Sequence, residues 1–338
     1  MEKSKLTLKK SMKIGCGTIL LLVFIFVAWV WLGLFTGPGA NKINDYHPFK
    51  SPRARERYLA HYDRRSQEWP VTFEDRFVPT SDGTTFVRIS GPQAAPPLVL
   101  LPSASANTLI WLPNVAALSQ DFRVYAVDNI YDFGRSIYLR EFKTPEDFTT
   151  WLDELFSGLG LDNEINLAGL SYGGWLTGQY ALRYPERLNK IVLMAPVATV
   201  QQLPLEWAKV AIKALLPHRY FMRQMVEWMF PALIQTPEGR ATAETMLEDA
   251  YLGLRCFKLK MTVTPTVLTD AELGQLQNVP ALYMVGDREV IYDPNAALER
   301  LRRVAPKIRT LLVPGAGHDL TIVRADLVDS KIVEFLQR

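Results

Sequence analysis

Residues 165–173 read INLAGLSYG, an apolar run that ends in a G-x-S-x-G pentapeptide. The run is typical of a buried strand, and the residues at 172–184 fit a helix. Gly169 and Gly173 flank Ser171 and allow a sharp strand-to-helix turn, in which larger side chains would collide. Such a turn exposes the serine hydroxyl at a helix N-terminus, where the helix dipole favours developing negative charge. The alternative is a glycine-rich turn in which Ser171 only caps the helix.

Apolar runs and helical patterns alternate on both sides of this turn. Strands are expected at eight places: 71–79, 84–89, 97–102, 122–128, 165–168, 191–196, 281–286 and 310–315. Helices are expected at 144–159, 172–184, 295–303 and 324–337. Strands that alternate with helices predict an α/β protein with a mostly parallel sheet covered on both faces.

One long interval interrupts the alternation. The residues between Pro196 and Pro280 are mostly helix-patterned and predict a cap over the carboxyl edge of the sheet, because the strand–helix pattern resumes beyond them. Between Trp207 and Phe230 this interval is rich in Trp, Met and Phe, which indicates either an adaptable apolar pocket or ordinary packing of cap helices. The predicted parts of the chain are a basic tail with a membrane anchor (1–36), a linker and lead-in helix (37–69), a core in two segments (70–200 and 280–338) and the cap (201–279).

Two later segments carry side chains that could act together with Ser171. VPGAGH at 313–318 ends on His318, which follows the last expected strand and precedes the last expected helix. GDREVIYDP at 286–294 follows the preceding strand and contains carboxylates. A histidine can take the proton of Ser171 and return it to a leaving group, while a carboxylate orients the histidine.

With these motifs the sequence resembles the α/β-hydrolase superfamily over about residues 70–338, and in particular its carboxylesterase-like serine hydrolases. The resemblance implies an α/β-hydrolase fold with a mostly parallel eight-stranded sheet, helices on both faces and a helical cap insertion. The family order of nucleophile, acid and histidine implies Ser171, Glu289 and His318. Glu289 fits the family spacing after the seventh strand, and Asp287 is the alternative acid.

The loop after the third strand departs from the family pattern. Many relatives carry His-Gly there, and this chain has Pro102-Ser103 at the same spacing before Trp111. The resemblance implies that the backbone N–H groups of Ala104 and Tyr172 form the oxyanion hole. The missing glycine motivates an alternative, a non-catalytic binding module on a hydrolase scaffold.

The N-terminal segment predicts a membrane anchor. Residues 14–35 contain no charged side chain, and at about 1.5 Å per residue they would span about 33 Å as a helix, enough for a bilayer core. A cleaved signal peptide is the alternative. Five lysines precede the segment, which predicts a single-pass protein of the cell membrane with a cytoplasmic N-terminus and an extracytoplasmic catalytic domain.

Composition excludes several other classes of protein. The net charge of +3 arises in residues 1–36, which carry +4, so that the remainder carries −1 and nucleic acid is not an expected partner. Two cysteines and four histidines without a C-x-x-C pair exclude a disulfide framework and a zinc-finger array. No metal, cofactor or obligate protein partner is expected.

The sequence therefore predicts a membrane-anchored serine hydrolase that cleaves a carboxylic ester through an acyl-enzyme. The expected partners are a small-molecule ester, with an apolar acyl or alkyl part, and the lipid bilayer through residues 14–35. Amide hydrolysis, acyl transfer or C–C cleavage with the same triad are alternatives, because a fold does not specify a substrate.

Overall fold

In the computed structural model, residues 43–338 are described apart from 215, 217, 259, 261 and 262. Every strand and helix that the structure describes belongs to one compact unit, which comprises Tyr46–Phe257 and Thr262–Arg338.

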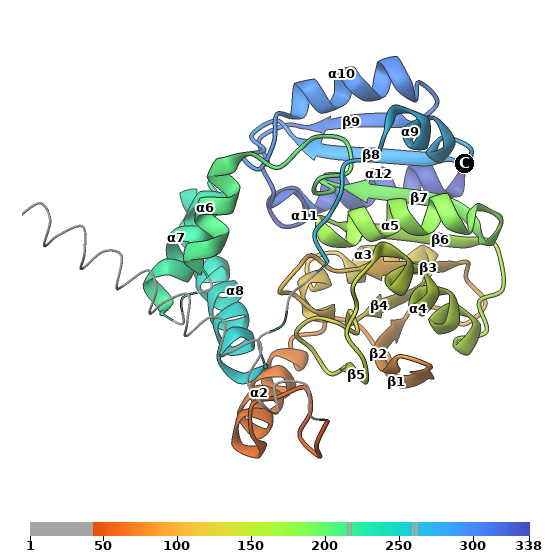
Figure 1. Cartoon of the computed structure of the whole chain (residues 1–338). Coiled ribbons are helices and arrows are strands. Elements are labelled where there is room, and N and C mark those ends of the chain that lie inside the picture. The colour runs from red at the N-terminus through yellow and green to blue at the C-terminus, as the bar shows by residue number, and fades with distance from the viewer. Residues whose placement is uncertain (1–42, 215, 217, 259, 261–262) are drawn as a thin grey trace, which may run out of the picture. The chain divides into compact units, whose positions relative to one another are not determined.

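A single sheet forms the centre of this unit. Its strands are β1 (Phe73–Thr80), β2 (Gly83–Ser90), β3 (Pro97–Leu101), β4 (Arg123–Val127), β5 (Ile137–Tyr138), β6 (Ile165–Leu170), β7 (Leu188–Met194), β8 (Ala281–Gly286) and β9 (Arg309–Val313). Eight of them lie in the order β1-β2-β4-β3-β6-β7-β8-β9, and β5 pairs with β2 (Figure 1). From β4 to β9 all neighbours are parallel, whereas β2 pairs antiparallel with β1, β4 and β5. The predicted sheet is confirmed; β5 was not predicted, because two residues carry no periodic pattern.

Helices cover both faces of the sheet (Figure 1). The α-helices are α2 (Pro52–Ser66), α3 (Val115–Asp121), α4 (Pro145–Gly158), α5 (Tyr172–Arg183), α6 (Leu205–Ala214), α7 (Arg219–Met229), α8 (Pro237–Cys256), α9 (Asp270–Leu276), α10 (Pro294–Val304), α11 (Leu320–Val323) and α12 (Ala325–Gln337), and the short 3-10 helices are η1 (Thr108–Trp111), η2 (Pro185–Arg187) and η3 (Leu233–Gln235). Alternate residues of a strand point to opposite faces, so Tyr283 of β8 joins one buried cluster and Met284 joins the other. The first cluster includes α4, α5, α9 and α10, and the second includes α2, α3 and α12.

Two helix starts follow from local sequence. Thr144 and Asp147 form a reciprocal capping box around Pro145, as expected at the start of α4. Asp293 Oδ1 accepts hydrogen bonds from the N–H groups of Asn295 and Ala296 and so caps α10. The side chain of Asp293 is therefore used by its own helix.

Helices α6, α7 and α8 occupy the interval between β7 and β8 and lie together in the structure (Figure 1). Helix α8 and the 3-10 helix η3 that precedes it contact loops that follow strands: Leu233 N of η3 donates to Asp319 Oδ2 at 2.8 Å, and a Cβ added to Gly253 of α8 would lie 2.2 Å from Phe133 Cδ2. Helix α9, which ends the interval, packs instead against α5 and α10. The boundaries at 201 and 279 stay a prediction.

The structure corrects the predicted location in the cell membrane. Residues 14–35, on which that prediction depends, lie outside the described residues. Within the described part of the chain, no helix combines the length and the apolar character needed to cross a bilayer. The longest described helix, α8, has 20 residues and carries six charged side chains, which are costly to place in hydrocarbon. This finding contradicts the membrane location, and the bilayer has no support as a partner.

Candidate active site

The turn between β6 and α5 has the strained geometry that the pentapeptide predicts. Ser171 has φ 56° and ψ −112°, a conformation that costs a non-glycine residue about 1–3 kcal/mol. Two backbone hydrogen bonds to the segment after β7 hold it, from Ser171 N to Met194 O at 2.8 Å and from Val197 N to Ser171 O at 3.2 Å. The Ser171 side chain makes no capping hydrogen bond to α5, so the cap-only alternative does not describe this turn.

The two glycines of the pentapeptide permit close backbone approach. A Cβ at Gly169 would lie 2.1 Å from Gly173 O, and a Cβ at Gly173 would lie 2.2 Å from Leu101 O and 2.6 Å from Pro102 O. The obstructing atoms belong to the backbone and cannot rotate away. Any side chain at Gly173 would therefore push α5 away from the end of β3.

We expect Gly173→Ala to lower the free energy of unfolding by about 1–3 kcal/mol, as other overpacked positions do. Gly178→Ala in the same helix is the matched control, because its Cβ would meet only Thr199 Cγ2 at 3.6 Å. A glycine-to-alanine change in a helix interior stabilises by about 0.5–1 kcal/mol. Urea denaturation of both variants measures the difference, and equal stability of the two would contradict this account of the turn.

His318 and Glu289 meet after the last two strands of the sheet. His318 Nδ1 lies 2.8 Å from Glu289 Oε2, and both side chains are buried. Glu289 Oε1 accepts the N–H groups of Val290 and Ile291, each at 2.9 Å. The carboxylate is thus held by its own backbone on one side and by the imidazole on the other, which leaves His318 Nε2 without a hydrogen-bond partner among the described residues.

Asp287 has a different position from Glu289. It is exposed, and its Oδ1 accepts the N–H of Gly315 at 2.8 Å. Asp287 therefore supports the loop that leads to the histidine, whereas Glu289 bonds to the imidazole itself.

The histidine loop folds over the end of β8. A Cβ at Gly286, the last residue of β8, would lie 2.1 Å from Ala316 O and 2.6 Å from Gly317 O. The loop from β9, which is at the edge of the sheet, therefore leads over the end of the neighbouring strand β8. Ser171 Oγ has no hydrogen bond with any described residue, His318 included.

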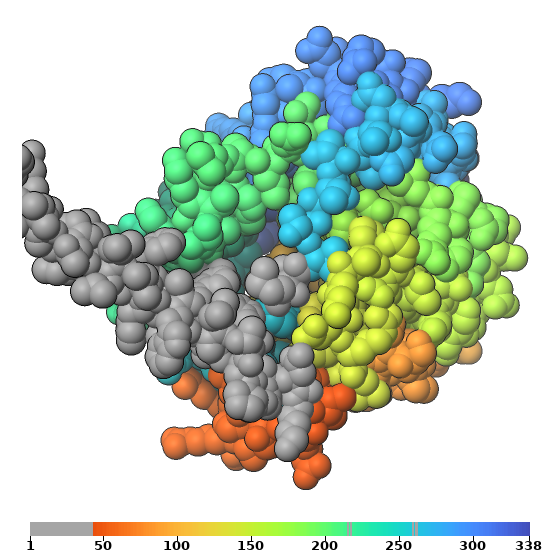
Figure 2. All heavy atoms as spheres, viewed as in Figure 1, coloured from red at the N-terminus to blue at the C-terminus, as the bar shows by residue number. Residues whose placement is uncertain are grey.

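Two backbone N–H groups next to the serine turn are available to a ligand. Ala104 lies in the loop after β3, whose end is in contact with Gly173, and Tyr172 is the first residue of α5. Neither N–H donates a hydrogen bond to a described residue. The Tyr172 hydroxyl donates instead to Val263 O at 3.0 Å, in the segment that crosses the face shown in Figure 2 before α9.

A buried carboxylate that was not predicted lies beside the histidine. Asp319 Oδ1 accepts Gly317 N and its Oδ2 accepts Leu233 N, both at 2.8 Å, so it connects the histidine loop to the segment between α7 and α8. Burial raises the pKa of this carboxyl. Its position after His318 is visible in the sequence, but Leu233 is 86 residues away and no local pattern indicates that contact.

We expect Asp319→Asn to destabilise the fold by about 1–3 kcal/mol, because an amide has one acceptor oxygen and leaves one of two buried N–H groups unpaired. Asp293→Asn is the matched control, since a single oxygen of Asp293 makes both capping bonds and asparagine caps helices equally well. Thermal unfolding of the two variants tests the difference; a larger loss for Asp293→Asn would show that Asp319 has no such role.

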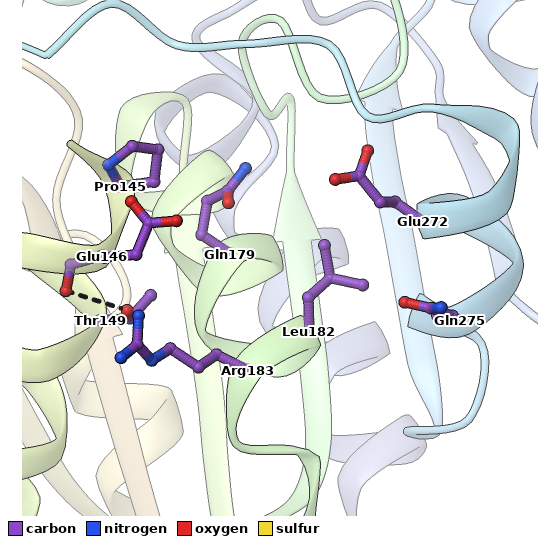
Figure 3. A pocket seen from close by; sticks show the side chains of 8 residues that line it. All are labelled: Pro145, Glu146, Thr149, Gln179, Leu182, Arg183, Glu272 and Gln275. Carbon is purple, nitrogen blue, oxygen red and sulfur yellow. Dashed lines mark hydrogen bonds between the residues drawn. The ribbon is translucent and has the colours of Figure 1, made fainter.

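A cavity of about 300 Å³ lies between α4, α5 and α9 (Figure 3). It is lined by Pro145, Glu146, Thr149, Gln179, Leu182, Arg183, Glu272 and Gln275. Gln179 is eight residues beyond Ser171, about 12 Å along the helix axis. None of the candidate catalytic residues lines this cavity.

Comparison with known proteins decides the family. A model described as the alpha/beta hydrolase family matches residues 98–329, which include Ser171, Glu289 and His318. The chain belongs to the α/β-hydrolase family.

Within this family the chain is similar to bacterial carboxylesterases. Carboxylesterase YbfK of Bacillus subtilis (strain 168) is 31% identical over 300 residues, 87% of this chain and 98% of that protein. The crystal structure of carboxylesterase CesB (YbfK) has a TM-score of 0.76 and 31% identity, covering 84% of this chain and 98% of that one. Naproxen esterase (carboxylesterase NP) of B. subtilis has a TM-score of 0.76 and 30% identity, covering 87% and 99%. The predicted fold and enzyme class are confirmed: the chain is a carboxylesterase-like α/β-hydrolase.

Proposed function

We propose that this α/β-hydrolase is a serine esterase in which Ser171, His318 and Glu289 form the catalytic triad. The observation that carries the proposal is the buried hydrogen bond between His318 Nδ1 and Glu289 Oε2, in loops that meet over the end of β8. A histidine held in this way has the correct tautomer to accept a proton at Nε2. The carboxylesterase relatives support an ester as the substrate.

The reaction proceeds in two steps. Ser171 Oγ attacks the ester carbonyl while His318 Nε2 takes its proton, and Glu289 stabilises the imidazolium. The N–H groups of Ala104 and Tyr172 receive the negative charge on the carbonyl oxygen. The proton passes from His318 to the departing alcohol. A water molecule, deprotonated by the same histidine, then attacks the acyl-enzyme, and His318 returns the proton to Ser171 Oγ as the bond to the carboxylic acid breaks.

The acyl or alkyl part of the substrate is apolar in this proposal. Trp207 of α6 and Trp228 of α7 are partly buried, and their ring centroids are 6.2 Å apart. Helix α7 also contains Met225 and Met229. Aromatic and methionine side chains adapt to apolar ligands of different length. Both tryptophans also pack against the core.

The test treats the full-length chain with a fluorophosphonate probe beside Ser171→Ala, and locates the adduct by mass spectrometry. We expect stoichiometric labelling of Ser171 and none of the variant. Hydrolysis of p-nitrophenyl acetate, butyrate and decanoate then measures chain-length preference, and we expect kcat/KM to rise with acyl length. A folded chain that neither labels nor hydrolyses these esters would contradict the proposal and favour the binding-module alternative.

A further inference from the structure

The loop that carries Ala104 lacks the glycine that its conformation would favour. Residues 102–107 read PSASAN, and Ser105 adopts φ 60°, in the left-handed region. A non-glycine residue keeps such a conformation only where its surroundings hold it. The contacts that hold this loop therefore decide where the Ala104 N–H points.

Three hydrogen-bonding groups outside the loop hold it. Ser105 N donates to Asp132 Oδ2 at 2.9 Å. Thr108 donates to Asp128 Oδ1 from its backbone N at 2.8 Å and from its hydroxyl at 2.7 Å. The third group is Tyr58 of α2, whose hydroxyl accepts Asn107 Nδ2 at 3.1 Å.

Helix α2 supplies two of the side chains in this network. Tyr58 and Tyr62 lie one turn apart and are 2% and 1% exposed. The Tyr62 hydroxyl donates to Asp128 Oδ1 at 3.3 Å, the same oxygen that receives Thr108. Burial raises the pKa of the Tyr58 hydroxyl well above its usual value, so the group stays neutral.

Aromatic contacts also hold the ring of Tyr58. The ring packs edge-on against Phe257 at a centroid distance of 4.8 Å and in a tilted arrangement against Phe49 at 5.8 Å. Asn107 is equally constrained, because its Oδ1 accepts Leu109 N at 3.0 Å and so caps the 3-10 helix that ends the loop. The Tyr58–Asn107 hydrogen bond therefore joins two groups that have little freedom to move.

We propose that α2 is a positioning element of the oxyanion hole, in which Tyr58 acts through Asn107 to hold the loop that presents the Ala104 N–H. Helix α2 spans Pro52–Ser66 and lies before the segment 98–329 that matches the family model. Helix α2 thus helps to hold Ser105 in a left-handed conformation that glycine would adopt without strain. This inference rests on the proposed function, because the Ala104 N–H matters only if an oxyanion forms.

The effect of losing this constraint falls on the transition state. The carbonyl oxygen gains its negative charge only as Ser171 attacks, so a displaced donor weakens binding of the transition state and not of the ground-state ester. Tyr58→Phe removes one hydroxyl and keeps the ring. We expect kcat to fall about fivefold to tenfold, the usual range for one hydrogen bond, with KM changed less than twofold.

Tyr180→Phe is the matched control. Tyr180 is also fully buried, and its hydroxyl makes a single hydrogen bond of 3.0 Å to Asp153 Oδ1, far along α5 from Ser171. We expect this variant to lose a similar amount of thermal stability and to keep the kcat of the wild type. An inhibition constant for a trifluoromethyl ketone, which forms an oxyanion on the serine, should rise for Tyr58→Phe and not for Tyr180→Phe.

A double-mutant cycle tests the route through Asn107. In an Asn107→Ala background, which lowers kcat by itself, Tyr58→Phe should have no further effect. The experiment uses the full-length chain and p-nitrophenyl butyrate. An active wild type whose kcat is unchanged in Tyr58→Phe, or equally lowered in Tyr180→Phe, overturns the inference and leaves the proposed function intact. A folded wild type that neither labels nor hydrolyses esters overturns both.

Discussion

Ser171→Ala is expected to lower kcat for p-nitrophenyl butyrate by about 10⁶-fold, the loss typical of a triad nucleophile. The acyl-enzyme cannot form without the hydroxyl, and only the oxyanion donors and substrate binding remain to accelerate attack by water. Steady-state kinetics at saturating ester measure the loss, and the fluorophosphonate adduct should disappear with it.

Two controls separate this loss from a change of fold. Alanine keeps the Cβ of Ser171 and leaves its backbone bonds to Met194 and Val197 in place, so the melting temperature should stay close to that of the wild type. The double variant Ser171→Ala/His318→Ala should be no slower than Ser171→Ala, because the two groups act as a unit. Retention of more than about 1% of the wild-type kcat in Ser171→Ala would exclude Ser171 as the nucleophile.

Glu289→Gln is expected to lower kcat/KM by about 10⁴-fold at neutral pH, as the corresponding change does in other triads. The neutral amide cannot stabilise an imidazolium. The N–H groups of Val290 and Ile291 bind the amide oxygen of the glutamine, so its NH₂ group faces His318 Nδ1. Nδ1 must then accept a hydrogen bond, which favours the tautomer with its proton on Nε2, so that Nε2 cannot accept the serine proton. The pH–rate profile and kcat/KM of the purified variant measure the effect.

Asp287→Asn is the matched variant for this prediction. Its amide oxygen can still accept the N–H of Gly315, so kcat/KM should stay within about threefold of the wild type, the effect of a change of well under 1 kcal/mol. A large loss in Asp287→Asn together with a small loss in Glu289→Gln would reverse the assignment of the acid. Comparable losses in both would indicate that the loop, and not one carboxylate, controls His318.

The alternation of apolar runs and helical patterns was sufficient to predict the sheet. Each of the eight expected strands corresponds to a strand of the structure. Buried parallel strands such as β3 and β6 are almost continuously apolar and need no distant information to be recognised. The strand order was not available from these patterns. Pairing between β3 and β6, which are separated by more than 60 residues, depends on hydrogen bonds that no local period encodes.

The candidate triad was predictable to different degrees. Ser171 and His318 follow from short motifs with few alternatives, whereas Glu289 and Asp287 are two residues apart and both fit a role near the histidine. Their environments separate them: one carboxylate is buried against His318 Nδ1, and the other bonds to Gly315 N at the surface. Which of the two carboxylates faces His318 depends on the path of the loop after β8, and the sequence pattern does not specify that path.

Small residues around Ser171 dictated the turn after β6, since only glycine tolerates backbone atoms about 2 Å from a Cβ position. No local sequence pattern predicts the long-range contacts that hold the loops around this turn. Tyr58, 49 residues before Asn107, and Leu233, 86 residues before Asp319, join the site through single hydrogen bonds. Local sequence determines which backbone conformations are accessible, but a hydrogen bond between distant segments forms only when the packed core has brought its donor and acceptor together.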